Sequence, residues 1–203
     1  HTAEIGYLLN GQQLVPPYYY RLTIPLHDYD TYPTYFAPSL SLYLAAFPEE
    51  ERRPEAAWEE LMHQSPLFHA DAILDDGDYC GFITSWHCAN FIYVEHFAIS
   101  SSRRGGGIGG RAFECFMKQC AGKEIVLEVE TPDTEIARRR IGFYERHAMH
   151  LLPNDYQQPP YRPTGEYFPL RIMSTLPEAT PAHFEEIKAA LHREVYGVKT
   201  FNP

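Results

Sequence analysis

A run of glycines in the middle of the chain constrains its fold more than any other segment. Residues 103–110 read Arg-Arg-Gly-Gly-Gly-Ile-Gly-Gly, between an apolar run at Phe91–Ile99 and a helical pattern at Arg111–Gln119. A strand that turns into a helix through glycines leaves backbone N–H groups unpaired at the positive end of the helix dipole. Glycine also permits positive φ and lets a bulky anion approach the backbone. The segment therefore predicts a turn that binds a phosphate or diphosphate.

Two common ligands of such turns can be tested against the sequence alone. A nucleotide P-loop ends in Gly-Lys-Ser/Thr, whereas residues 110–112 read Gly-Arg-Ala, so this motif is absent. The dinucleotide fingerprint G-x-G-x-x-G is matched by residues 105–110, and Glu128 or Glu130 lies near the distance expected of a ribose-binding acid. A dinucleotide site is therefore a serious local alternative.

The surrounding sequence does not suit a dinucleotide fold. The strand that feeds such a turn is buried on both faces and reads as a nearly continuous apolar run, but Phe91–Ile99 carries Glu95 and His96 in its middle. Two more strand-like runs, Phe68–Leu74 and Tyr79–Trp86, precede it and are joined by an Asp-Gly turn signal. Short connections imply antiparallel neighbours, so the glycine turn is predicted to end a meander.

The pattern Arg104-x-x-Gly107-x-Gly109 resembles the acyl-CoA pyrophosphate loop of the GNAT acetyltransferase superfamily, which joins the fourth strand to the third helix. Downstream, Ile125–Glu130 looks like the fifth strand of that family. A helical stretch that ends near Arg146 then resembles its fourth helix, with the tyrosine acid at Tyr144. The resemblance covers roughly residues 20–175.

Two further segments, Phe47–Pro54 and Tyr156–Pro160, resemble those of prokaryotic members of the family. The resemblance implies an α/β (α+β) GNAT fold: a mixed, mostly antiparallel central sheet with its fourth and fifth strands splayed, flanked by helices, plus an appended C-terminal helix. The expected organisation is an N-terminal extension over residues 1–19, the acetyltransferase domain over 20–176, and a C-terminal amphipathic helix and tail over 177–203.

Periodicity and turn residues predict the remaining elements. The C-terminal helix is expected either to cover the sheet or to serve an oligomer contact. The expected elements are a first strand at Tyr20–Ile24 stopped by Pro25, helices at Ser39–Phe47, Glu55–Gln64 and Pro181–Tyr196, a shaped loop at Asn154–Gly165, and a last strand at Tyr167–Met173.

The resemblance implies transfer of an acetyl group from acetyl-CoA, as cosubstrate, to an amine. Free alkylamines have a pKa of about 10, so a base must remove a proton. Strand alternation is expected to place Tyr93, Glu95, Phe97 and Ile99 on one face, and His96 on the other. The resemblance implies that the first face meets the acceptor, with Glu95 as the preferred base, direct or through water, and Tyr93 as the second candidate. Glu95 could instead be a buried carboxylate tied to an arginine, and His96 is read as structural.

The resemblance assigns the general acid to Tyr144, since a phenol with a pKa of about 10 stays protonated at neutral pH. Backbone N–H groups of Phe97, Ala98 and Ile99 would polarise the thioester carbonyl where the two strands splay. The residues expected to hold the diphosphate are Arg104, Gly105, Gly106, Gly107, Ile108, Gly109 and Gly110.

The two glutamates after the loop, Glu128 and Glu130, share one strand face. They could bind a cationic acceptor, but the sequence favours ion pairs with Arg138, Arg139 or Arg140. His147 and His150 lie three residues apart without a third ligand, so no metal site is expected.

Composition limits the partners. The 203-residue chain carries 27 acidic residues against 17 Lys plus Arg, a net charge of −10, which argues against nucleic-acid binding. Its four cysteines show no disulfide or zinc spacing, so a reduced, cytoplasmic protein is expected. No run reaches membrane-spanning length. The expected acceptor is a small amine, a polyamine or a peptide, and family members are commonly homodimers.

Two other functions stay open at this level. A non-catalytic module could bind acyl-CoA at the same loop, although it would need neither Tyr144 nor Glu95. A dinucleotide-dependent oxidoreductase would use the literal G-x-G-x-x-G match at residues 105–110.

Overall fold

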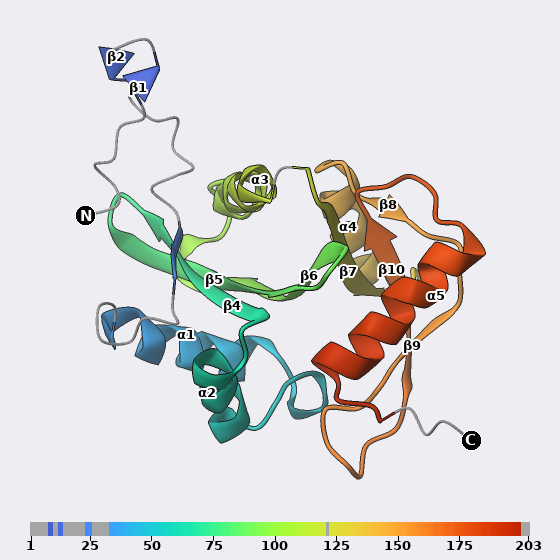
Figure 1. The fold of residues 1–203 in the computed structure, drawn as a ribbon. Helices are drawn as coiled ribbons and strands as arrows, with labels where there is room; N and C mark the ends of the chain where they lie inside the picture. The colour runs from blue at the N-terminus through green and yellow to red at the C-terminus, as the bar shows by residue number, and fades with distance from the viewer. Residues whose placement is uncertain (1–7, 10–11, 14–22, 26–32, 121, 200–203) are drawn as a thin grey trace.

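In the computed structural model, a central β-sheet is covered by helices on both faces (Figure 1). The structure describes residues 8–9, 12–13, 23–25, 33–120 and 122–199. The strands are β1 (Leu8–Leu9), β2 (Gln12–Gln13), β3 (Thr23–Pro25), β4 (Phe68–Asp75), β5 (Asp78–His87), β6 (Phe91–Ile99), β7 (Glu124–Glu130), β8 (His150–Leu151), β9 (Tyr156–Gln158) and β10 (Phe168–Ser174). The helices are α1 (Pro33–Ala46), α2 (Glu55–Gln64), α3 (Ile108–Gln119), α4 (Glu135–Glu145) and α5 (Pro181–Ala190), with short helical turns η3 (Glu49–Glu51), η4 (Ser101–Arg103) and η5 (Leu191–Val195).

The sheet has eight strands in the order β3-β4-β5-β6-β7-β10-β8, with β9 also paired to β10. Every pairing is antiparallel except that of β6 with β7. The β4–β5 turn has positive φ at Asp76 and Gly77, as the Asp-Gly signal predicts. The predicted mixed α/β fold with an antiparallel meander before the glycine turn is therefore confirmed.

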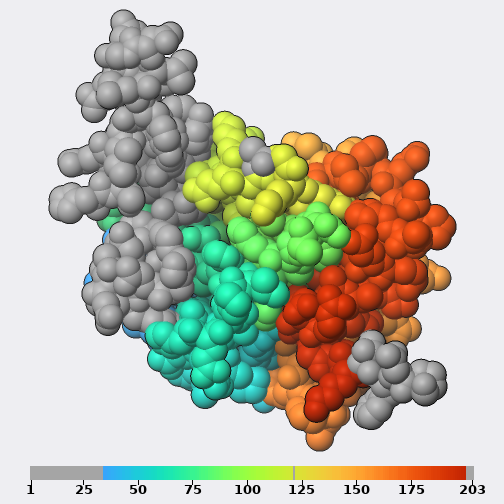
Figure 2. All heavy atoms as spheres, in the orientation of Figure 1, coloured from blue at the N-terminus to red at the C-terminus, as the bar shows by residue number. Residues whose placement is uncertain are grey.

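Two hydrophobic cores lie on opposite faces of the sheet. One joins α1, α2 and α5 to the sheet through side chains such as Tyr43, Trp58 and Phe184. The other lies beneath α3 and α4 and contains Phe113 and Ile141. Figure 2 shows α5, in red, lying directly against neighbouring segments of the domain. Of the two predictions for the C-terminal helix, covering the sheet is the one the structure confirms.

Some element boundaries differ from those predicted. The predicted first strand, Tyr20–Ile24 stopped by Pro25, is β3 (Thr23–Pro25) within the described residues, and Pro25 is its last residue. The segment predicted as a shaped loop contains the short strand β9, paired to β10. The α5 helix continues into a π-helical turn, η5, before the chain leaves it. Most of the predicted N-terminal extension lies outside the described residues.

The parallel pair β6–β7 opens partway along its length. Pairing runs only from Phe91 with Glu124 to Val94 with Leu127, although β6 continues to Ile99 and β7 to Glu130. The predicted splay is therefore confirmed, and it leaves β6 backbone groups facing a gap between the strands.

A β-bulge in β6 corrects the predicted strand alternation. Thr84 pairs with His96 and the next residue, Ser85, pairs with Val94, so Glu95 is the extra residue. One extra residue reverses which face the following side chains occupy. His96 therefore lies on the α1 face, with its ring 5.0 Å from that of Tyr43. Phe97 and Ile99 pack instead with the α3 core.

A glycine on β5 allows this part of the sheet to form. A Cβ at Gly81 would lie 2.1 Å from the carbonyl oxygen of Ala98 on β6. Gly81→Ala is therefore expected to lower the free energy of unfolding by about 3 kcal/mol, because the strands must move apart. Urea denaturation checks this, with Gly106→Ala as the control, since a Cβ there meets no atom within 4 Å. Equal denaturation midpoints for the two variants would contradict the interpretation.

Candidate functional site

The glycine turn borders an open cleft of about 540 Å³, called here the glycine-loop cleft. Gly105 and Gly107 have φ values of +90° and +73°, and Gly107 precedes the first residue of α3. Nine of the ten residues predicted to bind the cofactor line the cleft; Gly106 does not. The lining residues are Ala46, Phe47, Phe97, Ala98, Ile99, Arg103, Arg104, Gly105, Gly107, Ile108, Gly109, Gly110, Arg139, Arg140, Phe143 and Tyr144.

Arginine contacts hold the turn in shape. Nε of Arg104 donates to the carbonyl of Ile99 at 3.1 Å. Arg111 donates to the carbonyl of Gly106 at 2.9 Å, and both Arg103 and Arg111 lie within 4 Å of the Asp75 carboxylate. The positive charge at this end of the cleft is thus fixed to the loop, where an incoming anion would meet it.

Tyr144 lines the same cleft. The ring packs against that of Phe113, with centroids 5.3 Å apart. Burial raises the pKa of Tyr144 to about 12, and the charge of Arg140 opposes this shift. The phenol therefore stays protonated across the physiological range and can donate a hydrogen bond.

A second, smaller cavity of about 110 Å³ lies in the splay and is called here the glutamate pocket. It shares Phe47 and Arg140 with the glycine-loop cleft, so the two cavities adjoin. Both predicted base candidates, Tyr93 and Glu95, line it. The lining residues are Phe47, Glu51, Tyr93, Glu95, His96, Glu128, Val129, Glu130, Arg140, Gln158, Tyr161, Phe168 and Leu170.

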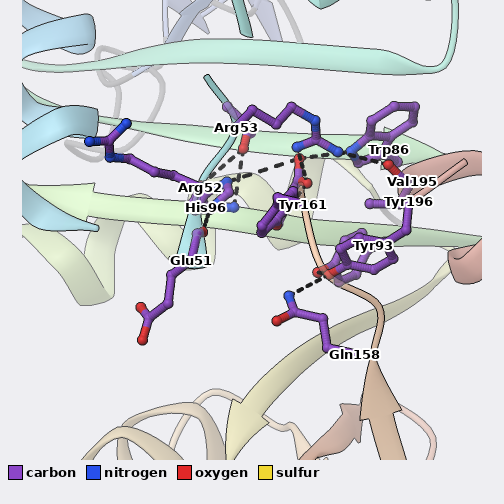
Figure 3. A network of polar contacts seen from close by, with 12 residues as sticks. Glu51, Arg52, Arg53, Trp86, Tyr93, His96, Gln158, Tyr161, Val195 and Tyr196 are labelled. Atoms are coloured by element: carbon purple, nitrogen blue, oxygen red, sulfur yellow. Dashed lines mark hydrogen bonds and ion pairs between the residues drawn. The ribbon is translucent and has the colours of Figure 1, made fainter. Parts of the chain in front are cut away.

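Glu95 is a fully buried carboxylate with several donors. It forms an ion pair with Arg53 and accepts hydrogen bonds from Trp86 Nε1 at 2.9 Å and the Tyr161 hydroxyl at 3.0 Å. The Arg53 guanidinium also donates to the carbonyl of Val195 at 2.8 Å and lies near Trp86 and Tyr161 (Figure 3). Burial alone would raise the pKa of Glu95, but Arg53, together with His96 and the hydrogen bond from Trp86, outweighs it, and the pKa lies below its usual value.

His96 lines the glutamate pocket, contrary to the prediction that it lies on the face away from it. Its Nε2 donates to the carbonyl of Glu51 at 2.9 Å, which leaves Nδ1 as the unprotonated nitrogen. Burial lowers the pKa of His96, so the ring is neutral at pH 7. The predicted position of His96 is therefore wrong, while its contacts with Glu51 and Tyr43 are those of a structural residue.

Glu128 is a second buried carboxylate of the glutamate pocket. Its oxygens accept hydrogen bonds from the hydroxyls of Tyr93 (2.9 Å), Tyr156 (2.5 Å) and Tyr196 (2.6 Å), and from Gln158 Nε2 (3.0 Å). Burial raises the pKa of Glu128 to about 7, although these donors oppose the shift.

The expected arginine pairing of this strand holds for only one glutamate. Arg140 lies 3.6 Å from Glu130, as expected. Among the described residues, the hydrogen-bond donors to Glu128 are three tyrosines and one glutamine, and no arginine pairs with it. The tyrosine cluster around Glu128 replaces the ion pair that the sequence favoured.

Sequence reasoning did not identify several residues that shape this site. Arg53 lies within the Phe47–Pro54 run, and Gln158 within the Tyr156–Pro160 segment, so the two prokaryotic-type segments were a signal that could have drawn attention to both. Tyr196 ends the predicted C-terminal helix and carries no local signal, because its partner Glu128 is 68 residues away.

Comparison with known proteins agrees with this architecture. Residues 30–149 match the model of the Acetyltransferase (GNAT) family. The protein YjbC of Bacillus subtilis (strain 168), named as a presumed acetyltransferase, is 28% identical over 159 residues, covering 76% of this chain and 78% of YjbC. A solved structure from Bacteroides thetaiotaomicron, also named as a presumed GNAT acetyltransferase, is 37% identical with a TM-score of 0.79, covering 87% of this chain and 99% of that one.

The fold is shared more widely. Arabidopsis thaliana Naa50, solved with the bisubstrate analogue CoA-Ac-MVNAL, has a TM-score of 0.52 at 16% identity, over 75% of this chain and 95% of that one. The chain belongs to the GNAT acetyltransferase family and is an acyltransferase. Acetyl transfer is the activity of that family, and acetyl-CoA is its acyl donor.

Two features are absent from the described residues. Within them, His, Cys, Asp and Glu side chains form no group of three or more that could hold a metal ion. None of the helices they form has the length and apolar character needed to cross a membrane.

The Arg53–Glu95 pair generates a stability prediction. Arg53→Met would leave Glu95 buried without a cation and should lower the free energy of unfolding by about 4 kcal/mol. The lone carboxyl would then have a pKa above its unfolded value, so the loss should grow as pH rises from 5 to 8. Urea denaturation at both pH values measures this. The double variant Arg53→Met/Glu95→Gln should recover stability, and a double variant no more stable than the single one would contradict it.

Proposed function

We propose that this protein is an N-acetyltransferase in which an amine acceptor attacks acetyl-CoA directly where the two cavities meet. The observation that carries the proposal is that the glycine-loop cleft and the glutamate pocket share Phe47 and Arg140 beside the splay. A donor in one cavity and an amine in the other would approach each other there, and such positioning is a large part of catalysis.

The glycine loop supplies the site for the CoA diphosphate. Gly107, Ile108, Gly109 and Gly110 at the start of α3 line the cleft, so their backbone N–H groups, with the helix dipole behind them, are proposed to bind the diphosphate, and Arg104 adds charge. The N–H of His96 bonds to Thr84 on β5 at 3.1 Å. By strand alternation the amides of Phe97 and Ile99 face the splay instead, so these two are better placed than Ala98 to polarise the thioester carbonyl.

Tyr144 is proposed to assist the leaving thiolate. Tyr144 lines the glycine-loop cleft, and its hydroxyl remains protonated, because burial raises the pKa to about 12. A phenol of this pKa favours its neutral form, so its main contribution is a hydrogen bond that stabilises the charge developing on sulfur.

Of the two predicted base candidates, the contacts support Tyr93 as the group that meets the amine. The oxygens of Glu95 receive bonds from Arg53, Trp86 and Tyr161, and its lowered pKa makes it a weak proton acceptor. Tyr93 lines the same pocket, and its hydroxyl already donates to another carboxylate. Glu95 is then best viewed as the anchor of Arg53.

The glutamate pocket favours a cationic amino group. Its charged lining includes Glu51, Glu95, Glu128 and Glu130 against Arg140. Its volume of about 110 Å³ suits the end of an acceptor and not a whole bulky molecule. A small amine, a polyamine and a peptide N-terminus all satisfy these conditions, as the peptide-containing analogue on the related fold of Naa50 illustrates.

Turnover tests the proposal. Acetyl-CoA with a panel of amines should give free thiol, which a module that only binds acyl-CoA would not produce. Tyr144→Phe should lower kcat by about 100-fold, while the dissociation constant of acetyl-CoA from calorimetry changes little. Unchanged turnover in this variant would remove Tyr144 from the mechanism.

The glycine loop can be tested separately from chemistry. Gly107→Ala should weaken CoA binding by about 10-fold or more, because φ of +73° disfavours a side chain where the amides must be presented. Gly122→Ala is the matched control: its φ is +83°, and it lies in the connection after α3. Calorimetry on both variants checks this. If CoA binding is weakened equally in both variants, or is unchanged in both, the diphosphate does not bind at the glycine loop.

A further inference from the structure

The two buried carboxylates of the glutamate pocket have opposite electrostatic environments. Glu95 is neutralised by the permanent charge of Arg53. Within the described residues, the hydrogen-bond donors to Glu128 are all uncharged. Environments that separate two neighbouring carboxyl groups in this way commonly assign them different roles. Glu95 is suited to remain an anion, and Glu128 to exchange a proton.

Several hydroxyl groups of the glutamate pocket converge on the Glu128 carboxylate. Tyr93 and Tyr196 both donate to Oε2 of Glu128, at 2.9 and 2.6 Å. Gln158 Nε2 donates to the Tyr196 oxygen at 2.7 Å, while Tyr156 donates to Oε1 at 2.5 Å. Figure 3 shows Tyr93, Tyr196 and Gln158 gathered at one place from separate segments. Because Tyr93 donates its proton to Glu128, a lone pair of its oxygen, which also lies 3.2 Å from the Tyr196 hydroxyl, can accept a hydrogen bond from a group in the pocket.

We propose that Glu128 takes up the proton of the incoming ammonium through the hydroxyl of Tyr93, and that Tyr196 is a positioning residue that holds the Glu128 carboxylate for this step. The inference rests on the acetyl transfer proposed above. It adds a proton route, and it gives the C-terminal helix a part in the reaction.

The proton and bond changes balance without a further reactant. The ammonium gives a proton to the Tyr93 oxygen as Tyr93 passes its own to Glu128, which leaves a neutral amine and a carboxylic acid. The amine nitrogen forms a bond to the acetyl carbon, and the carbon–sulfur bond breaks. The nitrogen loses its second proton and the thiolate gains one, with Tyr144 beside the sulfur. Glu128 then releases its proton to solvent, so ammonium and acetyl-CoA give the amide, the free thiol and one proton.

Tyr196 reaches this site because of how α5 ends. The five-residue π-helical turn η5 follows α5, and Tyr196 comes directly after it. Such turns are rare and frequently occur at functional sites. The preceding residue, Val195, accepts a hydrogen bond from Arg53, so one segment touches the partners of both carboxylates. Tyr196 lies outside residues 30–149, which the family model matches.

The charges around Glu128 set the direction of the expected pH dependence. Besides the donors named above, the charged or titratable groups facing the pocket are Glu51, Glu95, His96, Glu130 and Arg140, with Tyr161 beside them. His96 is neutral, and Arg140 is paired with Glu130. With the pKa of Glu128 raised to about 7, activity should fall below that pH as the carboxylate is protonated. Removal of one hydroxyl donor should raise this pKa further, because the anion loses a hydrogen bond.

Two measurements test the proposal. The first follows the NMR chemical shift of the Glu128 carboxyl carbon from pH 4 to 10, a titration that needs no acceptor. The second measures kcat/KM against pH by free-thiol release, with the fastest acceptor among 1,4-diaminobutane, benzylamine and a tripeptide with a free N-terminus. Tyr196→Phe should move both midpoints upward by about one pH unit and retain the plateau at high pH. Glu128→Gln and Tyr93→Phe should lower kcat by about 100-fold, and Glu128→Gln should also abolish the acidic limb.

Controls separate this proposal from the proposed function. Tyr167→Phe removes a hydroxyl from a side chain that is 49% exposed and should leave both midpoints in place. Acetyl-CoA affinity by calorimetry should be equal in all variants. Absence of acetyl-CoA binding or thiol release in the wild type would refute the acetyl transfer itself. If the wild type binds acetyl-CoA and releases thiol, two results would overturn the proton route, even if another variant fails to fold. One is a fall of kcat/KM at low pH that persists unchanged in Glu128→Gln. The other is a pair of midpoints that do not move in Tyr196→Phe.

Discussion

The buried ion pair between Arg53 and Glu95 is the interaction on which the site depends. Arg53 follows the helical turn η3, and Glu95 is the extra residue of the β6 bulge. The same guanidinium holds the Val195 carbonyl, and the same carboxylate holds Trp86 on β5. Because an unpaired buried charge costs several kcal/mol, loss of either partner would destabilise the packing of these segments against one another. The C-terminal extension is therefore part of the site's framework as well as a cover for the sheet.

The two buried carboxylates of the pocket differ in how their charges are stabilised. Burial raises the pKa of Glu128 to about 7, the charge of Glu95 adds to the rise, and the tyrosine hydroxyls oppose it. The pocket thus holds one carboxylate whose pKa is lowered, with Arg53 as its cation, and one whose pKa is raised to about 7. The splay of β6 and β7 places both beside the cleft that the glycine loop borders.

Local signals were enough to predict much of the fold. The glycine turn, the Asp-Gly turn and the apolar runs each specify a few adjacent residues, and together they predict the meander and the start of α3. The side-chain alternation of β6 could not be predicted beyond Glu95. A bulge adds one residue without changing composition, and a single residue is enough to reverse the faces.

The site residues that could not be predicted from the sequence, such as Arg53 and Tyr196, were missed for a different reason. Arg53 is separated from Glu95 by 42 positions and Tyr196 from Glu128 by 68. Pairings at such separations depend on the finished fold and leave no periodic pattern in the sequence. The local motif predicted where a diphosphate would be held, whereas the protonation chemistry of the acceptor side became visible only once distant segments were placed together.

A crystal structure with coenzyme A tests the central claim most directly. The account predicts the diphosphate against the amides at residues 105–110, and the sulfur next to the Tyr144 hydroxyl where Phe47 and Arg140 join the two cavities. A diphosphate bound away from the glycine loop, or a sulfur directed away from the glutamate pocket, would contradict it.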